Sequence, residues 1–158
     1  MDSEKSQEEH ERTLRDPTPL NPAVAAERLR EVKQVFDHHG IVFWLGSGTC
    51  LGCIRENGFI PWDDEIDTAS VIGMHGLNEE TVYRIAGVFQ DKGFHVRVRS
   101  NERYMYVGLI KEGLRTDWTC HRIIGGAAIE FPGVKLPLHL FTHPGTVEFI
   151  GREFRVPN

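Results

Sequence analysis

Residues 63–67, Asp-Asp-Glu-Ile-Asp, place four acidic side chains at the start of an apolar segment that ends at Ile72. The stretch from Glu65 predicts a strand, in which residues i and i+2 project from the same face. Glu65 and Asp67 would then present two carboxylates side by side, with Ile66 turned to the core. Two adjacent carboxylates repel each other unless a cation lies between them, and hard oxygen ligands suit Mg²⁺ or Mn²⁺. A solvated acidic turn before a strand has the same composition, so this run alone leaves both interpretations open.

A glycine-rich break precedes this strand by one predicted helix. The apolar residues 41–45 predict a short buried strand, Gly46-Ser47-Gly48 interrupts it, and a short helix is expected through Arg55. Glycines let a phosphate approach the backbone, and the N-terminus of a helix supplies N–H donors for it. A lone Gly-Ser-Gly is usually only a turn. Its position before a strand that carries Glu-x-Asp would put a phosphate cradle and a metal site on neighbouring strands of one sheet.

The rest of the chain alternates between helical and strand-like periodicity. Asn21-Pro22 is a helix start, and apolar residues recur at helical spacing until Gly40. Asn78 is expected to cap a second helix, which Gly93 ends. Strand-like stretches follow at residues 94–98, 105–109 and 114–120, with a hairpin over 147–156. The fold class is therefore α/β or α+β, with a mixed β-sheet flanked by helices and no regular βαβ repeat.

Length and composition restrict the class of protein further. The 158 residues amount to about one domain. Residues 1–20 are polar and charged, so we expect a disordered or loosely ordered tail there, and a single domain over residues 21–158. The net charge of −5 argues against a general nucleic-acid surface, but leaves room for a small anionic substrate.

Three cysteines without a secretory signal favour a reducing compartment, and no apolar run approaches the roughly 18 residues of a membrane span. We therefore expect a soluble, cytoplasmic protein without a membrane span.

Two segments carry a resemblance to a known family. Residues 43–55, Phe-Trp-Leu-Gly-Ser-Gly-Thr-Cys-Leu-Gly-Cys-Ile-Arg, and residues 58–67, Gly-Phe-Ile-Pro-Trp-Asp-Asp-Glu-Ile-Asp, resemble the signature of the LicD/fukutin family. That family belongs to the nucleotidyltransferase-fold superfamily. The helix before the first segment and the late segment 147–157 also resemble it, whereas the middle of the chain matches only loosely.

The resemblance implies a reaction and a set of site residues. Members transfer a phosphorylated alcohol, such as phosphocholine or ribitol phosphate, from a CDP-activated donor to a glycan or polyol hydroxyl. Carried over by position, Glu65 and Asp67 would be the paired ligands of Mg²⁺ or Mn²⁺. Asp117 is the best candidate for a third catalytic carboxylate, either as a metal ligand or as the general base. Asp63 and Asp64 would orient the ligands from outside the coordination sphere. The substrate would contact Gly46, Ser47, Gly48, Thr49 and Arg55, although Arg55 could equally be a surface residue of its helix.

The chain differs from the family pattern in three places. Glu65 replaces the usual Asp, and Cys50 and Cys53 stand where the family has apolar or small residues. With Cys120 and His121 these cysteines could form a zinc site, but small buried hydrophobes in a reduced protein are the preferred interpretation. The sequence also ends at Asn158, where members usually continue into another helical segment, so the domain would lack that extension.

Three functions remain open on the sequence alone. The first is a LicD-type phosphotransferase. The second is a nucleotidyltransferase that moves a nucleoside monophosphate onto a small acceptor, and it would use the same metal geometry. The third is a non-catalytic binding module on the same fold. The sequence does not name the donor alcohol, the acceptor or the oligomeric state.

Overall fold

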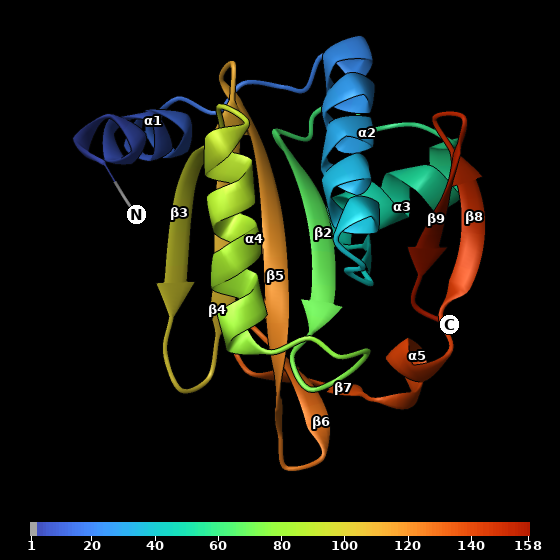
Figure 1. Cartoon of the computed structure of the whole chain (residues 1–158). Helices are drawn as coiled ribbons and strands as arrows, with labels where there is room; N and C mark the ends of the chain where they lie inside the picture. The colour runs from blue at the N-terminus through green and yellow to red at the C-terminus, as the bar shows by residue number, and fades with distance from the viewer. Residues whose placement is uncertain (1–2) are drawn as a thin grey trace.

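The computed structural model describes residues 3–158, which fold into helices packed around a mixed sheet (Figure 1). The elements in chain order are α1 (Glu4–Arg15), α2 (Pro22–His38), β1 (Trp44–Leu45), α3 (Ser47–Glu56), β2 (Glu65–Val71), α4 (Glu79–Asp91), β3 (His95–Ser100), β4 (Met105–Lys111), β5 (Leu114–Ile124), β6 (Ala127–Glu130), β7 (Val134–Pro137), α5 (His139–Thr142), β8 (Gly145–Phe149) and β9 (Arg152–Val156). No helix among the described residues is long and apolar enough to cross a bilayer.

The main sheet has the strand order β1-β2-β5-β4-β3. β2 and β5 run parallel, whereas β1 pairs antiparallel with β2, and β4 pairs antiparallel with both β5 and β3. The far end of β5 pairs with β6, which in turn pairs with β7. The predicted mixed sheet flanked by helices is confirmed. β1 is shorter than the strand expected over residues 41–45, and β5 continues four residues beyond the expected Cys120.

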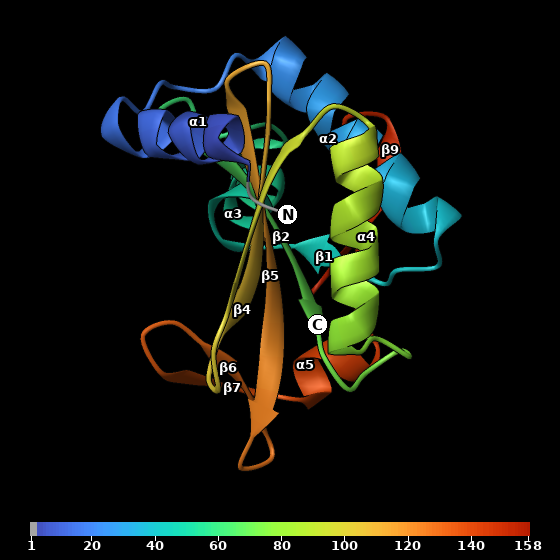
Figure 2. The ribbon, with the colours of Figure 1, turned by 60° about the vertical axis from the view of Figure 1, so that its left-hand side comes forward.

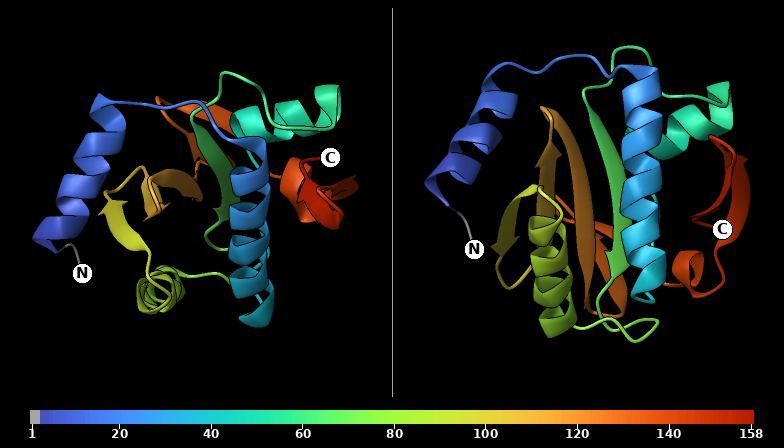
Figure 3. Two further views of the ribbon diagram at one scale, coloured as in Figure 1. Left: turned by 90° about the horizontal axis from the view of Figure 1, so that it is seen from above. Right: turned by 45° about the horizontal axis from the view of Figure 1, so that its top comes forward.

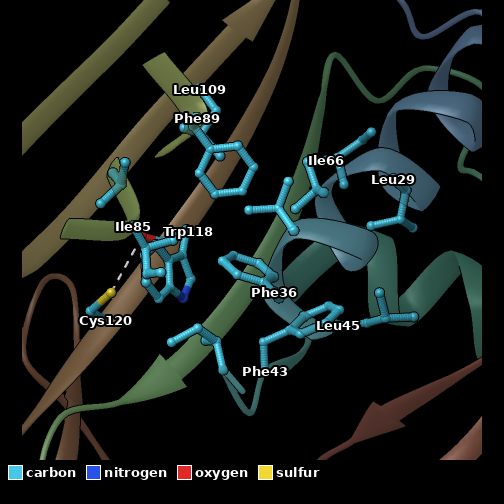
Figure 4. Packing of buried hydrophobic residues seen from close by; sticks show 14 of the residues in the cluster. Leu29, Phe36, Phe43, Leu45, Ile66, Ile85, Phe89, Leu109, Trp118 and Cys120 are labelled. Carbon is cyan, nitrogen blue, oxygen red and sulfur yellow. Dashed lines mark hydrogen bonds between the residues drawn. The ribbon is translucent and has the colours of Figure 1, made fainter. Parts of the chain in front are cut away.

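Strand alternation gives the sheet two different faces. One face carries the buried residues Ile66, Leu109 and Trp118, which pack beneath α2 and α4 (Figure 4). The ring of Phe36 on α2 lies at the centre of this core, with its centroid 4.8 Å from Trp118 and 5.5 Å from Phe89 of α4. Both helices lie on the same side of the sheet (Figure 2). The opposite face is therefore left to the odd-numbered residues of β2 and β5.

The helices that cover the core begin where the sequence predicts. The side chain of Asn21 accepts hydrogen bonds from the backbone N–H groups of Ala23 and Val24, and Pro22 occupies the first helical position. Asn78 caps α4 by accepting from the N–H of Thr81 at 2.8 Å. These caps satisfy donors that have no partner within the helix, so they fix where each helix starts.

The β8–β9 hairpin lies beside α3, at the β1 side of the sheet (Figure 3). Its aromatic residues hold it there: the ring centroid of Phe149 lies 5.2 Å from that of Phe59, and Phe154 lies 6.3 Å from Phe43. Phe149 and Phe154 are both buried. This late segment therefore supports the loop that follows α3, which leads into the acidic strand.

The structure has a helix, α1, where the composition suggested a disordered or loosely held tail. Ser3 caps it by accepting from the N–H of Ser6, and polar side chains dock it on β3 and β4. The Oγ of Ser6 lies 3.2 Å from Nδ1 of His95, and Nε2 of His10 lies 3.0 Å from the carbonyl oxygen of His95. His10 fits because Gly108 has no side chain, since a Cβ there would lie 2.9 Å from Cε1 of His10. A helix that docks through polar groups lacks the apolar stripe by which helices are recognised in a sequence.

We expect Gly108→Ala to displace α1 while leaving the core intact. The added methyl would overlap the buried ring of His10, which packing and a hydrogen bond hold in place. Hydrogen exchange should show faster exchange in residues 4–15 and unchanged protection in α2 and α4. Unchanged protection of α1 would contradict the docking described here.

Candidate active site

Three carboxylates meet on the face of the sheet that α2 and α4 leave uncovered. The parallel pairing of β2 with β5 sets Asp67 directly opposite Asp117, and Glu65 precedes Asp67 by two residues on the same face. Oxygen atoms of Glu65, Asp67 and Asp117 all lie within 4.8 Å of one another. The structure therefore brings together the three residues that the sequence proposed as catalytic, although Asp117 lies 50 residues away along the chain.

Arg115 is the cation of this cluster, and the sequence analysis did not single it out. Its Nε donates to Oδ1 of Asp117 at 2.8 Å and lies 3.7 Å from Oε2 of Glu65. The pairing register sets Arg115 opposite Glu65 on β2. The sequence did contain a signal for this role. Arg115 lies two residues before Asp117 in a predicted strand, and such residues lie on the same face.

Burial and mutual repulsion raise the pKa of two of these carboxyls. Burial, followed by the negative charges of Asp117 and Asp67, raises the pKa of Glu65 to about 9. Burial, followed by the charge of Asp117, raises the pKa of Asp67 to about 7. One arginine therefore does not offset three carboxylates that share this partly buried space. A second positive charge is what the cluster needs in order to ionise fully.

The residues present fit a hard divalent cation. Carboxylate oxygens are the ligands that Mg²⁺ and Mn²⁺ favour, and the cluster offers three within the reach of one ion. Among residues 3–158 no other group of acidic, His or Cys side chains meets the same distance criterion, so the alternative zinc site has no support there. Cys53 and Cys120 are buried free thiols, as the preferred interpretation expected, whereas Cys50 is only half-buried.

The glycine turn before α3 holds the backbone of Asp67 from two sides. The N–H of Gly46 donates to the carbonyl oxygen of Asp67 at 3.0 Å, and the N–H of Asp67 donates to Oγ1 of Thr49 at 2.8 Å. Thr49 is only 1% exposed, so its hydroxyl fixes Asp67 and does not face a substrate. Ser47 begins α3 and is exposed, with a left-handed φ of 39°.

The remaining predicted residues lie at different distances from the carboxylates. The carboxylate of Asp63 lies against Gly48, where a Cβ would come within 2.6 Å of Oδ2, and its charge also raises the pKa of Asp67. Asp64 is exposed, and its N–H donates to Oδ1 of Asp63. Arg55 is exposed in the last turn of α3, about 12 Å along the helix from Ser47 at 1.5 Å per residue. The structure thus places Asp63 near the cluster and Arg55 away from the glycine turn.

A cavity of about 420 Å³ opens beside Asp67 and is lined by Gly46 and Ser47. Its other wall is largely apolar and includes Trp44, whose ring stacks on that of Phe141 at 4.6 Å. A larger cavity, of about 510 Å³, lies on the helix-covered side of the sheet and has none of the three carboxylates in its lining. Of the three carboxylates, Asp67 lines this cavity together with the glycine turn, so an anionic group there could contact both.

The fold and this cluster define a protein of the nucleotidyltransferase-fold class. The fold matches the crystal structure of ANT(2″)-Ia in complex with adenylyl-2″-tobramycin with a TM-score of 0.54 and 15% identity, over 84% of this chain and 68% of that one. A family model described as LicD/FKTN/FKRP, nucleotidyltransferase domain, matches residues 40–158. The chain belongs to that family, as the resemblance of its two motifs implied.

Individual relatives match over shorter stretches. An uncharacterized protein of Rickettsia typhi is 30% identical over 80 residues, which is 51% of this chain and 24% of that protein. The lipopolysaccharide cholinephosphotransferase LicD of Haemophilus influenzae is 55% identical over 31 residues, covering 20% of this chain and 12% of the relative. The ribitol-5-phosphate transferase FKTN of Mus musculus is 42% identical over 43 residues, covering 27% and 9%. The matched stretches span about a quarter or less of these relatives.

Gly52→Ala should distort the loop that leads into the acidic strand. A Cβ at this buried position of α3 would lie 2.5 Å from the carbonyl oxygen of Gly58 and 3.1 Å from the N of Ile60. Backbone atoms cannot yield cheaply, so we expect a loss of about 1–3 kcal/mol in the free energy of unfolding, measured by urea denaturation. Gly87→Ala in α4 is the matched control, because a Cβ there meets nothing within 4 Å. It should gain about 0.5–1 kcal/mol, and equal losses in both variants would contradict the prediction.

Glu65→Gln should stabilise the protein at alkaline pH when no divalent cation is present. The raised pKa of Glu65 means that the folded state binds its proton more tightly than the unfolded state, so stability falls as the pH rises from about 4.5 to about 9. Glutamine stays neutral and removes this penalty. In EDTA, the variant should melt about 2–4 °C above the parent protein at pH 8.5 and close to it at pH 4.5.

The exposed Glu27 on α2 provides the control. Glu27→Gln should leave the pH dependence of melting unchanged. A Glu65→Gln variant that melts below the parent protein at pH 8.5 in EDTA would show that Glu65 is not under strain from its neighbours.

Proposed function

We propose that the chain transfers a phosphorylated alcohol, of the phosphocholine or ribitol-phosphate kind, from a CDP-activated donor to a hydroxyl group of a glycan or polyol. The observation that carries this proposal is the cluster of Glu65, Asp67 and Asp117 beside the glycine turn of Gly46 and Ser47. The names of two relatives, a cholinephosphotransferase and a ribitol-5-phosphate transferase, support the choice of transferred group. A cytoplasmic location belongs to the same proposal.

Glu65, Asp67 and Asp117 would hold Mg²⁺ or Mn²⁺ in this proposal. When bound, the ion neutralises the diphosphate of the donor and stabilises the charge that develops on the leaving nucleotide. The raised pKa values of Glu65 and Asp67 imply that the cluster loses protons when it takes up the ion. Metal affinity should therefore increase from pH 6 to pH 8.

The chain's own groups would position the reactants. The backbone N–H groups at the start of α3 and the exposed hydroxyl of Ser47 bind the donor phosphates. The acceptor oxygen forms a bond to the phosphorus that carries the alcohol, the bond from that phosphorus to CMP breaks, and CMP leaves. The proton of the acceptor hydroxyl passes to a carboxylate of the cluster, for which Asp117 is the candidate if it is not a metal ligand. Arg115 holds Asp117 in place through its 2.8 Å hydrogen bond.

The proposal is tested by incubating the protein with Mg²⁺ or Mn²⁺ and, separately, with CDP-choline, CDP-ribitol and CTP. CMP released from a CDP-alcohol supports the proposal. Pyrophosphate released from CTP would instead support the nucleotidyltransferase alternative, and calorimetric binding without turnover would support a non-catalytic module.

Asp67→Asn should reduce CMP release by at least about a hundredfold, because it removes one carboxylate from the charge-stabilising cluster. It should also weaken binding of Mn²⁺ in calorimetry. Glu27→Gln, on the opposite side of the sheet, should change neither quantity. Full activity in Asp67→Asn would show that the reaction does not use this cluster.

A further inference from the structure

A second cavity, of about 390 Å³, lies on the same face of the sheet as the carboxylates. Thr119, two residues after Asp117 on β5, is part of its lining. On β4, Gly108 is paired with Asp117, and Tyr106 is paired with Thr119. Tyr106 and Thr119 line this cavity, so it begins where the carboxylate cluster ends. Thr119 also lines the cavity at the glycine turn. The two cavities therefore adjoin over β5 at Thr119, two residues beyond Asp117.

Two turns from distant parts of the chain build the far wall of the second cavity. Tyr104, at the end of the β3–β4 turn, meets Phe131 of the β6–β7 turn with ring centroids 5.5 Å apart and planes at 66°. The side-chain oxygen of Asn101 accepts from the N–H groups of Arg103 and Tyr104, both at 2.8 Å, which fixes the first turn. Phe131 is 76% exposed although it is a large apolar ring. This arrangement holds an exposed aromatic surface in a fixed position, as a binding site requires.

The composition of the lining matches a sugar ring. The rings of Tyr104 and Phe131 offer an apolar surface for the C–H groups of a pyranose, and the hydroxyls of Tyr106 and Thr119 can pair with its hydroxyl groups. Ligand sites combine apolar walls with a few placed polar groups in this way. The lining also includes Arg99 and His121 but no acidic side chain, and that distinguishes it from the carboxylate cluster.

The direction of the reaction assigns this cavity to the acceptor. In the proposed function, the donor phosphates lie at Gly46 and Ser47, on the β2 side of the cluster. Displacement at phosphorus keeps the attacking and leaving oxygens roughly in line, so the acceptor approaches from the side opposite the leaving nucleotide. On the β4 side of Asp117, His10 of α1 covers Gly108, so the acceptor would reach the carboxylates past Tyr106 and Thr119, where the second cavity lies.

We propose that this second cavity is the acceptor site and binds a sugar ring of a glycan, with Tyr104 and Phe131 as its platform. The assignment of the ring to an acceptor rests on the proposed function. Tyr106 and Thr119 direct one hydroxyl of the bound sugar toward the carboxylates. Sugar binding at this site does not require a bound metal or donor.

Phe131→Ala tests the site directly, because the exposed ring contributes little to folding. The assay uses whichever CDP-alcohol donor the parent protein uses. The KM for methyl glycosides of common hexoses and N-acetylhexosamines should rise about tenfold, as expected for a lost aromatic contact. Val134→Ala is the control, since Val134 is exposed on the same hairpin and does not line the cavity. An unchanged KM for the glycosides in Phe131→Ala would overturn the proposal.

A binding measurement separates this proposal from the proposed function. In a two-dimensional amide NMR spectrum, millimolar methyl glycosides should shift residues 104–106, 119 and 131 of the parent protein, and Phe131→Ala should lose these shifts. CDP with Mg²⁺ should instead shift residues 46–49. Glycoside shifts without any donor turnover would support the sugar site and count against the proposed reaction. Donor turnover in a protein whose cavity residues do not respond to any glycoside would overturn the sugar site alone.

Discussion

The parallel pairing of β2 with β5 is the constraint on which the site depends. It sets Asp67 opposite Asp117 on adjacent strands. The separation of the two carboxylates therefore follows from the spacing of strands in a sheet. Gly46 and Thr49 then fix the backbone of Asp67 through its carbonyl oxygen and its N–H. The glycine turn thereby serves two purposes at once, because it shapes the cavity and holds an acidic strand in register.

The cost of this arrangement is electrostatic. Three carboxylates share a partly buried space with one arginine, and burial, followed by the repulsion between them, raises the pKa values of Glu65 and Asp67. In the proposed function, the same charges that destabilise the free protein would provide its affinity for a divalent cation. The hydrophobic core on the other face of the sheet, centred on Phe36 and Trp118, has to offset the destabilisation caused by the carboxylate cluster.

Much of the fold and part of the site could be predicted from the sequence because both have local signatures. The caps at Asn21 and Asn78 are side-chain effects within four residues, and the shared face of Glu65 and Asp67 follows from strand geometry. Arg115 was missed although it lies two residues before its partner Asp117 on one strand. Its second contact, with Glu65, depends on which strand lies next to β5, and no local pattern encodes strand order. Thr49 was assigned to the substrate, whereas its hydroxyl serves the backbone of Asp67, a partner 18 residues away.

Helix α1 is a further feature that local sequence patterns could not predict. Its docking depends on the absence of a side chain at Gly108 and on polar contacts with β3, so low apolar content alone could not reveal it. The aromatic pair of Tyr104 and Phe131 likewise comes from two turns that become neighbours only in the folded sheet. In both cases the decisive contact joins segments that are remote in sequence.

The most direct test of this account is a crystal structure of the protein soaked with Mn²⁺, with the ion located by its anomalous scattering. The account predicts one strong anomalous peak coordinated by carboxylate oxygens of Glu65 and Asp67, beside Asp117. A peak bound elsewhere, or a cluster that stays free of the ion at saturating Mn²⁺ and pH 8, would contradict it.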